Sequence, residues 1–476
     1  MNKPNVFLAV MDAVRPDHLS CYGHTRRTTP NIDILAQEAV LFENAFSAAP
    51  WSPPSHASMF TGMYPSQHGV LGKNLYLDEE IPTVAEIFSS KGYKTLGICV
   101  NDWVSSKTGL DRGFDKFISH AYMHRGYRGY IKRWAPRLSL DWILFCLETD
   151  IKFLMHNWSH EAEVFQEIKK WILNSQKRNK PFFIFVNYFD AHTPYVAPQP
   201  FQEKFQRVYN HKVDLEKISD AFNSRHGYPY IAKEIEVSEE EWDVLKSWYD
   251  GSIAYIDFFL GKLFDYLKER ELYDDTFTVI TSDHGESFGE HQLANHVFCL
   301  YDTLLHVPLV IRSPEPTSGG KKISNIVSNI DIFPTLLDIL DMKSKSKISG
   351  VNLLPFDNRI YHKYVFAEYG PPVADITALK RMSPNVESSL CNKYNKNLKC
   401  IRSDSFKYII TSDEKEELYN LEKDPDESRN VLAEFPEKAE ELKSLLTSQL
   451  KARPFHKRVS AFDDEMKRRL QELGYF

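Results

Sequence analysis

Residues 51–62 read Trp51-Ser52-Pro53-Pro54-Ser55-His56-Ala57-Ser58-Met59-Phe60-Thr61-Gly62 and predict a tight turn that presents one hydroxyl group at the start of a helix. The two prolines fix the approach to the helix and cost no hydrogen bond, because a first helical turn needs no N–H donors. A helix N-terminus also favours the negative charge of an activated oxygen. Ser52 is therefore the candidate nucleophile, although a simple helix cap is the alternative for such a turn taken alone.

Apolar runs rich in β-branched residues alternate with amphipathic segments on both sides of this turn. The runs lie at residues 6–10, 95–100, 182–187, 276–281 and 307–312. Such alternation is typical of an α/β fold in which a large, mostly parallel sheet is sandwiched between helices.

The pattern changes past residue 355 to short strands, expected to be antiparallel, followed by two helical segments. We therefore expect a catalytic α/β domain at 1–355 and a smaller C-terminal α+β subdomain at 356–476. Two stretches rich in aromatic and basic residues, at about 120–160 and 200–237, lack a clear period and resemble insertions over the open end of the sheet. Each is a candidate substrate lid or a plain surface subdomain.

Polar side chains follow three of the apolar runs at the point where each run ends. Asp12 follows the first run, Asp190 and His192 follow the third, and Asp283 and His284 follow the fourth. Because ligands of open α/β sheets bind beyond the carboxyl ends of the strands, these side chains should converge. Carboxylate and imidazole groups together can hold a divalent metal, whereas either cluster alone is also compatible with a helix cap and a buried histidine.

Composition and charge limit the kinds of partner and the cellular compartment that we expect for this protein. The chain has 476 residues, of which 42% are hydrophobic, and a net charge of −7 without a basic stripe that would neutralise nucleic acid. Six scattered cysteines indicate reduced thiols, and the apolar N-terminus has neither the length nor the cleavage site of a secretory signal, so we expect a cytoplasmic protein. The longest apolar run outside the predicted strands is too short for a transmembrane segment. The sequence does not indicate an oligomeric state.

Several different motifs follow one another along nearly the whole chain. They include Asp12-x-x-Arg15-x-Asp17-His18, Tyr64-Pro65-x-x-His68-Gly69, Gly109-Leu110-Asp111-Arg112-Gly113-Phe114-Asp115, Asp190-x-His192-x-Pro194-Tyr195, Ser282-Asp283-His284-Gly285-Glu286-x-x-Gly289-Glu290-His291 and Glu417-Leu418-Tyr419-Asn420-Leu421. Together with the Ser52 turn, these motifs resemble the sulfatase branch of the alkaline phosphatase superfamily. In that family a Cys or Ser is followed by x-Pro-Ser-Arg.

The resemblance implies a metal-dependent hydrolase of ester bonds. Its single divalent ion, most often calcium but compatible with magnesium, manganese or zinc, would be held by Asp12, Asp283 and His284, with the Ser52 oxygen on the metal. His192 and His296 would lie on the opposite wall, where they bind the transferred group or protonate the leaving alcohol. For His192 the alternative is a histidine that only anchors the adjacent turn.

Lys107 is a further candidate for substrate binding, because the lysine-x-histidine pair of many arylsulfatases has no other match in this region. A second metal would need Asp190, His192 and His296. Many sulfatases also have a second Asp on the first strand, where this chain has Ala13, so one possible ligand is lost.

His56 is a further candidate catalytic residue, and it stands in the Ser52 turn where the family has arginine. In sulfatases the Cys or Ser becomes formylglycine, and the converting enzymes are thought to read that arginine. A formylglycine hydrate can expel sulfate through its second hydroxyl group, whereas a plain serine suits phosphorus esters, whose serine adduct can be cleaved by metal-activated water.

The function expected is therefore the hydrolysis of a sulfate ester at the Ser52 position. The alternatives are a phosphomonoesterase, phosphodiesterase or phosphonate-ester hydrolase with unmodified Ser52, or a binding protein that has lost turnover. In the enzymatic cases the substrate would be a sulfated or phosphorylated small molecule or glycan.

Overall fold

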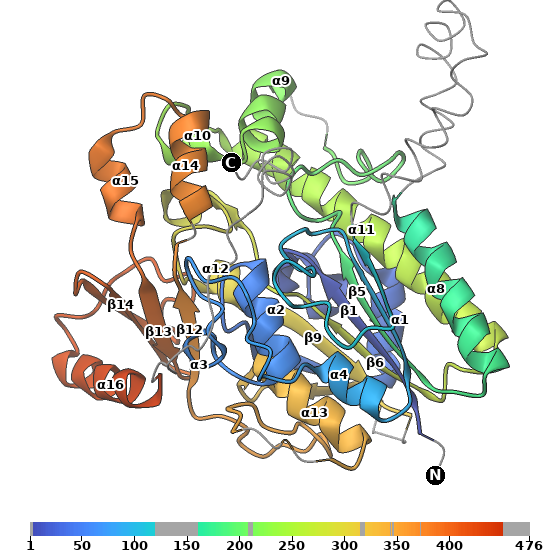
Figure 1. Cartoon of the computed structure of the whole chain (residues 1–476). Coiled ribbons are helices and arrows are strands. Elements are labelled where there is room, and N and C mark those ends of the chain that lie inside the picture. Colours follow the sequence, from blue (N-terminus) through green and yellow to red (C-terminus); the bar gives the residue numbers. More distant parts are fainter. Residues whose placement is uncertain are drawn as a thin grey trace, which may run out of the picture.

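The computed structural model describes residues 3–119, 160–207, 213–314, 319–342, 344, 347–371 and 373–450. Its centre is a nine-stranded sheet in the order β10-β2-β9-β6-β1-β5-β3-β4, with β11 beside β2 (Figure 1). The strands are β1 (Asn5–Met11), β2 (Val40–Phe46), β3 (Lys94–Cys99), β4 (Lys116–Ser119), β5 (Phe182–Tyr188), β6 (Thr276–Thr281), β9 (His306–Arg312), β10 (Lys321–Ile323) and β11 (Val327–Ser328).

The five apolar runs of the sequence form β1, β3, β5, β6 and β9, which confirms the expected strands. Strands β6, β1, β5, β3 and β4 are parallel to one another, whereas β9 runs antiparallel to both of its neighbours, β2 and β6. The sheet is thus mostly parallel, as the alternation of strands and helices predicted.

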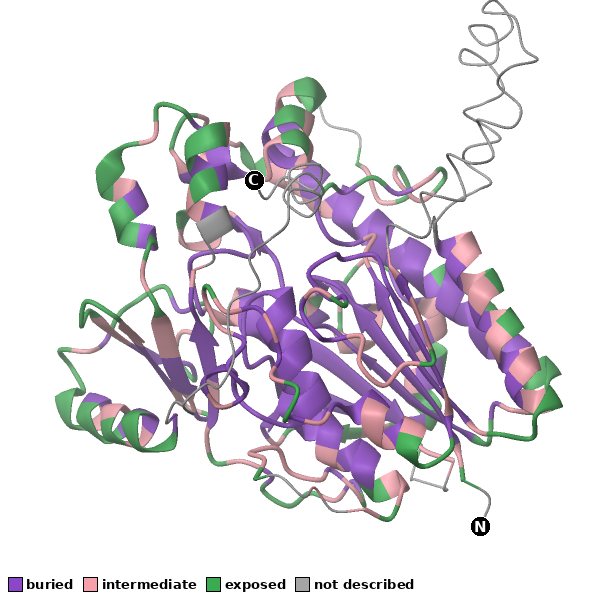
Figure 2. Cartoon of the chain, viewed as in Figure 1, coloured by how far each residue is buried: buried purple, intermediate pink, exposed green. Residues whose placement is uncertain are grey.

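Side chains of β1 alternate between two hydrophobic clusters, one on each face of the sheet. Phe7, Ala9 and Met11 pack on one face, and Val6, Leu8 and Val10 pack on the other. The first face is covered by α1 (Pro30–Glu38), α8 (His160–Lys177) and α11 (Glu239–Glu269), and the second by α2 (Ser52–Thr61), α4 (Val84–Ser90) and α13 (Ile332–Ile339). Because both faces are covered, every residue of β1 is buried (Figure 2).

The long helix α11 begins at a capping box. The Ser238 hydroxyl accepts a hydrogen bond from the Glu241 N–H, and the Glu241 carboxylate accepts one from the Ser238 N–H. These two bonds satisfy N–H groups that have no partner within the helix.

The C-terminal part forms a separate antiparallel sheet. Its strands follow the order β12 (Val365–Tyr369), β13 (Leu398–Arg402), β14 (Phe406–Thr411) and β15 (Glu416–Asn420), and α16 (Pro436–Gln449) packs on it. Helices α14 (Val373–Met382) and α15 (Ser388–Tyr394) lie between its first two strands in the chain. The expected α+β character is confirmed, while the boundary at residue 355 stays a prediction.

The two expected insertions differ in what the structure describes. Nearly all of the stretch at about 120–160 lies outside the described residues. The described part of 200–237 contains α9 (Leu215–Ile218), a π-helical turn η4 (Ser219–Ser224) and α10 (Tyr228–Ile231), and α10 packs against α14.

The remaining elements are short connections between these layers. They are η1 (Pro16–His18), η2 (Ser20–Tyr22), α3 (Pro65–His68), β7 (Ser287–Phe288), η5 (Glu290–Gln292), β8 (Ala294–Asn295), α12 (Asp302–Leu305) and η6 (Asn329–Asp331). Among the described helices, none has both the length and the apolar character that crossing a membrane requires.

Candidate active site

The turn at residues 51–62 has the predicted form. Trp51 is extended, Ser52 is the first residue of α2, and the two prolines occupy the next two positions. The helix ends at Gly62, whose φ of 71° is left-handed and whose close contact with Phe333 leaves little room for a side chain. All ten residues of α2 are buried, so its N-terminus presents the Ser52 hydroxyl from a fixed position.

Asp12, Asp283 and His284 converge beside this hydroxyl group. Asp12 follows β1, and the other two residues follow the neighbouring parallel strand β6, so the three ligating atoms lie within 4.8 Å of one another. The His284 Nε2 atom is 3.7 Å from Asp12 Oδ1, 3.4 Å from Asp283 Oδ2 and 3.4 Å from Ser52 Oγ. The structure therefore brings together the four residues of the expected nucleophile and metal site.

The two carboxylates fit a cation, because each has one oxygen held by the protein and one without a partner. Asp12 Oδ2 accepts hydrogen bonds from the side-chain amides of Asn101 and Asn187, at 3.1 and 2.8 Å. Asp283 Oδ1 accepts from the backbone N–H groups of Ala13 and His284. Asp12 Oδ1 and Asp283 Oδ2 are buried without any hydrogen-bond partner, an arrangement that a bound cation would satisfy.

His56 lies beneath the backbone of Ser52. Its Nδ1–H donates a hydrogen bond to the Ser52 carbonyl oxygen at 2.9 Å, and Nδ1 is 3.6 Å from Asp283 Oδ2. The ring packs edge-on against Phe60 and Phe185 and is fully buried. His56 thus supports the main chain that carries Ser52.

Two more histidines extend from the candidate metal group. The ring centroids of His284 and His296 are 4.4 Å apart, and those of His296 and His192 are 4.7 Å apart. The His192 Nδ1–H donates to the Thr193 carbonyl, and its ring stacks on Phe189. The structure therefore places His296 beside His284 and His192 beside His296.

His284, His296 and His192 form a histidine row, and burial shifts the pKa values of the first two. Burial and the neighbouring His296 lower the pKa of His284 to about 3, and burial and His192 hold the pKa of His296 well below its usual value. Burial also raises the pKa of Glu286, whose carboxylate is 3.4 Å from His296, to about 7.

The remaining expected residues have less support from the geometry. Lys107 is half-buried in the segment between β3 and β4, and its role stays a prediction. Asp190 lies near Glu161, whose pKa is raised by burial and by the Asp190 charge. Within the described ranges, Asp190, His192 and His296 are not among the groups whose ligating atoms converge, so the structure offers no support for a second metal there.

Asn101 and Asn187 belong to the site and were not expected from the sequence. The Asn101 amide also donates to Ser52 Oγ at 2.9 Å. Asn187 is near the end of β5 and Asn101 follows β3, so both lie at the same carboxyl edge as Asp12. That position is the signal by which the sequence could have shown them.

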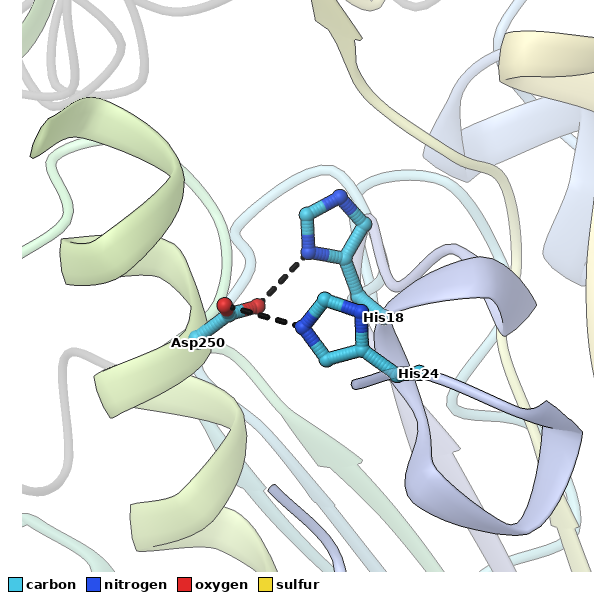
Figure 3. A group of neighbouring side chains, drawn as sticks. All are labelled: His18, His24 and Asp250. Carbon is cyan, nitrogen blue, oxygen red and sulfur yellow. Dashed lines mark hydrogen bonds and ion pairs between the residues drawn. The ribbon is translucent and has the colours of Figure 1, made fainter. Parts of the chain in front are cut away.

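A second group of possible metal ligands consists of His18, His24 and Asp250 (Figure 3). Asp250 Oδ1 is 2.6 Å from His18 Nδ1, and Oδ2 is 3.1 Å from His24 Nε2. Arg26 also donates to Oδ2 at 2.8 Å, so the carboxylate already has a cationic partner. Burial alone would raise the pKa of Asp250, but hydrogen bonds from His18 and His24 hold it well below the usual value. We interpret this group as an ion cluster that ties the segment after β1 to α11.

The fold and the candidate site define an α/β protein in which two aspartates and a histidine, Asp12, Asp283 and His284, lie together at the carboxyl edge of the sheet. Residues 4–342 match the sulfatase family, to which the chain therefore belongs. The protein is thus an ester-hydrolysing enzyme of the alkaline phosphatase superfamily.

Individual relatives agree with this assignment. The chain is 25% identical to an arylsulfatase of Clostridium perfringens, over 95% of each chain, and 25% identical to arylsulfatase K of Homo sapiens, over 91% of this chain and 80% of the relative. Among solved structures, the phosphonate monoester hydrolase of Agrobacterium radiobacter superimposes with a TM-score of 0.71 at 25% identity, over 94% of this chain and 95% of that one.

Proposed function

We propose that the protein is a metal-dependent hydrolase of sulfate esters in which the Ser52 position supplies the nucleophile. The observation that carries this proposal is the position of Ser52 Oγ, at the N-terminus of α2 and 3.4 Å from His284 Nε2. The unpartnered oxygens of Asp12 and Asp283 lie in the same group. A hydroxyl group at this position can lose its proton and act as a nucleophile, and the helix N-terminus stabilises the negative charge that results.

Asp12, Asp283 and His284 would hold one divalent ion. When bound, such an ion lowers the pKa of a nearby hydroxyl group and stabilises the charge of the transferred group. Calcium is our first choice, and the mixed oxygen and nitrogen donors also suit magnesium, manganese or zinc.

The other residues orient the reacting groups. Asn101 holds the nucleophilic oxygen, and His56 holds the main chain behind it. His192 and His296 would hydrogen-bond the ester opposite Ser52, and the proton lost by the attacking hydroxyl group would reach the alcohol oxygen on this side as the bond from sulfur to that oxygen breaks. We assign Lys107 a supporting role in binding the negatively charged substrate.

The arylsulfatase relatives support sulfate as the transferred group. In a formylglycine hydrate, one hydroxyl group would attack sulfur and release the alcohol. Loss of the proton from the second hydroxyl group would then re-form the aldehyde and expel sulfate, and water would restore the hydrate.

A second candidate is the hydrolysis of phosphate or phosphonate esters by unmodified Ser52. It is favoured by His56, which replaces the signature arginine, and by the similarity to a phosphonate monoester hydrolase. There, Ser52 Oγ would attack phosphorus and displace the alcohol as the bond from phosphorus to the alcohol oxygen breaks, and water would later cleave the serine adduct between phosphorus and Oγ and restore Ser52.

The mass of the proteolytic peptide that contains Ser52 separates the two candidates. In protein isolated from its native host, loss of two hydrogens at Ser52 supports the sulfate mechanism. An unmodified serine, with faster hydrolysis of p-nitrophenyl phosphate than of p-nitrophenyl sulfate, would replace it with the phosphorus-ester mechanism.

We further propose a cytoplasmic location and a sulfated small molecule or glycan as substrate. The free thiols of the five described cysteines support a reducing compartment. The substrate proposal is supported by the family and by the polar, histidine-lined side of the site.

A further inference from the structure

We propose that His226, from the insertion at about 200–237, is a specificity-determining residue that binds the alcohol part of the ester. This inference rests on the proposed function, since it assigns a further substrate contact to the same site. His226 lies far in sequence from every expected site residue, and three features of the structure bring it to the histidine row.

A single side-chain amide connects the backbones of His226 and His296. The Asn295 Nδ2–H donates to the His226 carbonyl at 3.2 Å, and Asn295 Oδ1 accepts from the His296 N–H at 2.8 Å. The position of His226 is therefore coupled directly to that of a proposed substrate-binding histidine.

The segment before His226 is bound to the chain that follows His192. The Thr193 hydroxyl donates to the Phe222 carbonyl at 3.0 Å, and the Tyr195 N–H donates to Asn223 Oδ1 at 2.9 Å. Together with the Asn295 contact, these bonds attach the insertion to both segments that carry the proposed histidines. The insertion is thus built into the wall of the site.

The backbone reaches this position at the cost of strain. His226 has a φ of 49° and Asn295 one of 66°, both in the left-handed region that non-glycine residues rarely adopt. Gly227 approaches so closely that an added Cβ would lie 2.7 Å from the Cβ of Ala294. Strained conformations that the surrounding structure enforces concentrate at functional sites.

The order of the rings indicates which part of the substrate His226 would contact. His284 adjoins Ser52, His296 adjoins His284, and His192 adjoins His296. His226 is close enough to this row that the charge of His192, in addition to burial, lowers its pKa to about 3. Because the row begins at the nucleophile, we assign its outer end to the alcohol rather than to the transferred sulfur or phosphorus.

A neutral imidazole ring offers one hydrogen-bond donor and one acceptor. A hydroxyl group of the substrate can use either one, whereas an unsubstituted apolar alcohol can use neither. The side chain of His226 is half-buried, so it keeps a surface that a ligand can contact. His226 would therefore favour esters of hydroxylated alcohols, the chemical class of sugars.

The test compares two substrates that carry the same transferred group, glucose 6-sulfate and p-nitrophenyl sulfate, together with the two corresponding phosphates. We expect His226→Ala to lower kcat/KM for the glucose ester by about tenfold or more, mainly through KM, and for the aryl ester by less than about threefold. His226→Gln, which keeps a donor and an acceptor, should recover part of the loss. Ser224→Ala, an exposed position of the same segment, should change neither substrate.

Equal losses on both substrates, or no loss on either, would overturn the role of His226. Binding of the glucose esters to Ser52→Ala protein, with and without His226→Ala, is measured by calorimetry in parallel. If the wild type hydrolyses no ester but His226→Ala weakens this binding at least fivefold, the proposed function fails while the inference stands. If His226→Ala leaves the binding unchanged, or no glucose ester binds, the inference is wrong.

Discussion

The Asn101 side-chain amide donates a hydrogen bond to Ser52 Oγ at 2.9 Å. The candidate nucleophile, at the start of α2, is therefore held by a residue that follows β3. The same nitrogen lies 3.1 Å from Asp12 Oδ2. One amide therefore orients both the attacking oxygen and a proposed metal ligand.

Asn101→Ala should lower kcat by about 10- to 1000-fold, because a preorganised donor at the reacting oxygen is lost. The matched control is Asn187→Ala, which removes the other amide on Asp12 and leaves the Asn101 hydrogen bond to Ser52 in place. Asn187→Ala should weaken metal binding. At saturating metal it should keep a larger fraction of the wild-type kcat than Asn101→Ala does. Steady-state kinetics over a metal titration would contradict this account if both variants lost kcat equally at saturation.

Calcium should raise the unfolding temperature of the wild type, because it would neutralise the unpartnered oxygens of Asp12 and Asp283. At about 100 times its Kd, a bound ion adds roughly 2.7 kcal/mol to the free energy of unfolding. Asp283→Asn should lose this increment and, without calcium, should unfold no more easily than the wild type. Differential scanning fluorimetry with chelator and with calcium measures both effects. An equal calcium effect in the two proteins would show that Asp283 is not a ligand.

His56→Arg should destabilise the fold even though arginine is the signature residue at this position. The fully buried His56 ring packs between Phe60 and Phe185, and a longer charged side chain would overpack this space. We expect a loss of about 1–3 kcal/mol in the free energy of unfolding, measured by urea denaturation. A variant as stable as the wild type would show that the pocket can accept the family residue.

Lys407 joins strand β14 of the C-terminal sheet to Asp302 at the start of α12. It is fully buried, with Nζ 2.7 Å from Asp302 and 2.8 Å from Glu427. Lys407→Met should reduce the free energy of unfolding by about 3 kcal/mol, because the buried Glu427 carboxylate loses its cation, whereas Asp302 keeps its ion pair with Arg402. The control Lys438→Met, which breaks a surface pair with Glu441, should cost less than about 1 kcal/mol. Similar losses for the two variants would contradict the importance of burial here.

Asp375 makes stability depend on pH. Burial raises the pKa of its carboxyl group to about 7, although a hydrogen bond from Tyr369 acts in the opposite direction. The folded state thus holds a proton that the unfolded state releases near its ordinary pKa, so stability declines between about pH 4 and pH 7. Asp375→Asn should therefore gain stability relative to the wild type at pH 8, on the order of a few kcal/mol, and little at pH 4. Thermal unfolding across this range would contradict the account if the difference did not grow with pH.

The sequence predicts those features whose signal is local. Ser52 follows from a proline-rich helix start, and Asp12 and Asp283 follow directly after apolar runs. Strand β2 gives no such signal, because Glu43 and Asn44 interrupt its apolar pattern, and the structure accommodates them with an irregular register.

Tertiary contacts explain the remaining gaps. Asn101 and Asn187 acquire their roles only when neighbouring strands bring them to Asp12. His226 reaches the site through the Asn295 bridge, which no spacing along the chain could reveal. Strand β15 has only a weak signal in the sequence, because Glu416 and Glu417 precede its short apolar pattern.

The most direct test of the central claim is the hydrolysis of p-nitrophenyl sulfate and p-nitrophenyl phosphate by metal-loaded wild type, by chelated wild type and by Ser52→Ala. We predict turnover of at least one ester, a loss of about 1000-fold or more in Ser52→Ala, and a loss on chelation that added calcium reverses. Activity of Ser52→Ala within about tenfold of the wild type would contradict the assignment of the nucleophile.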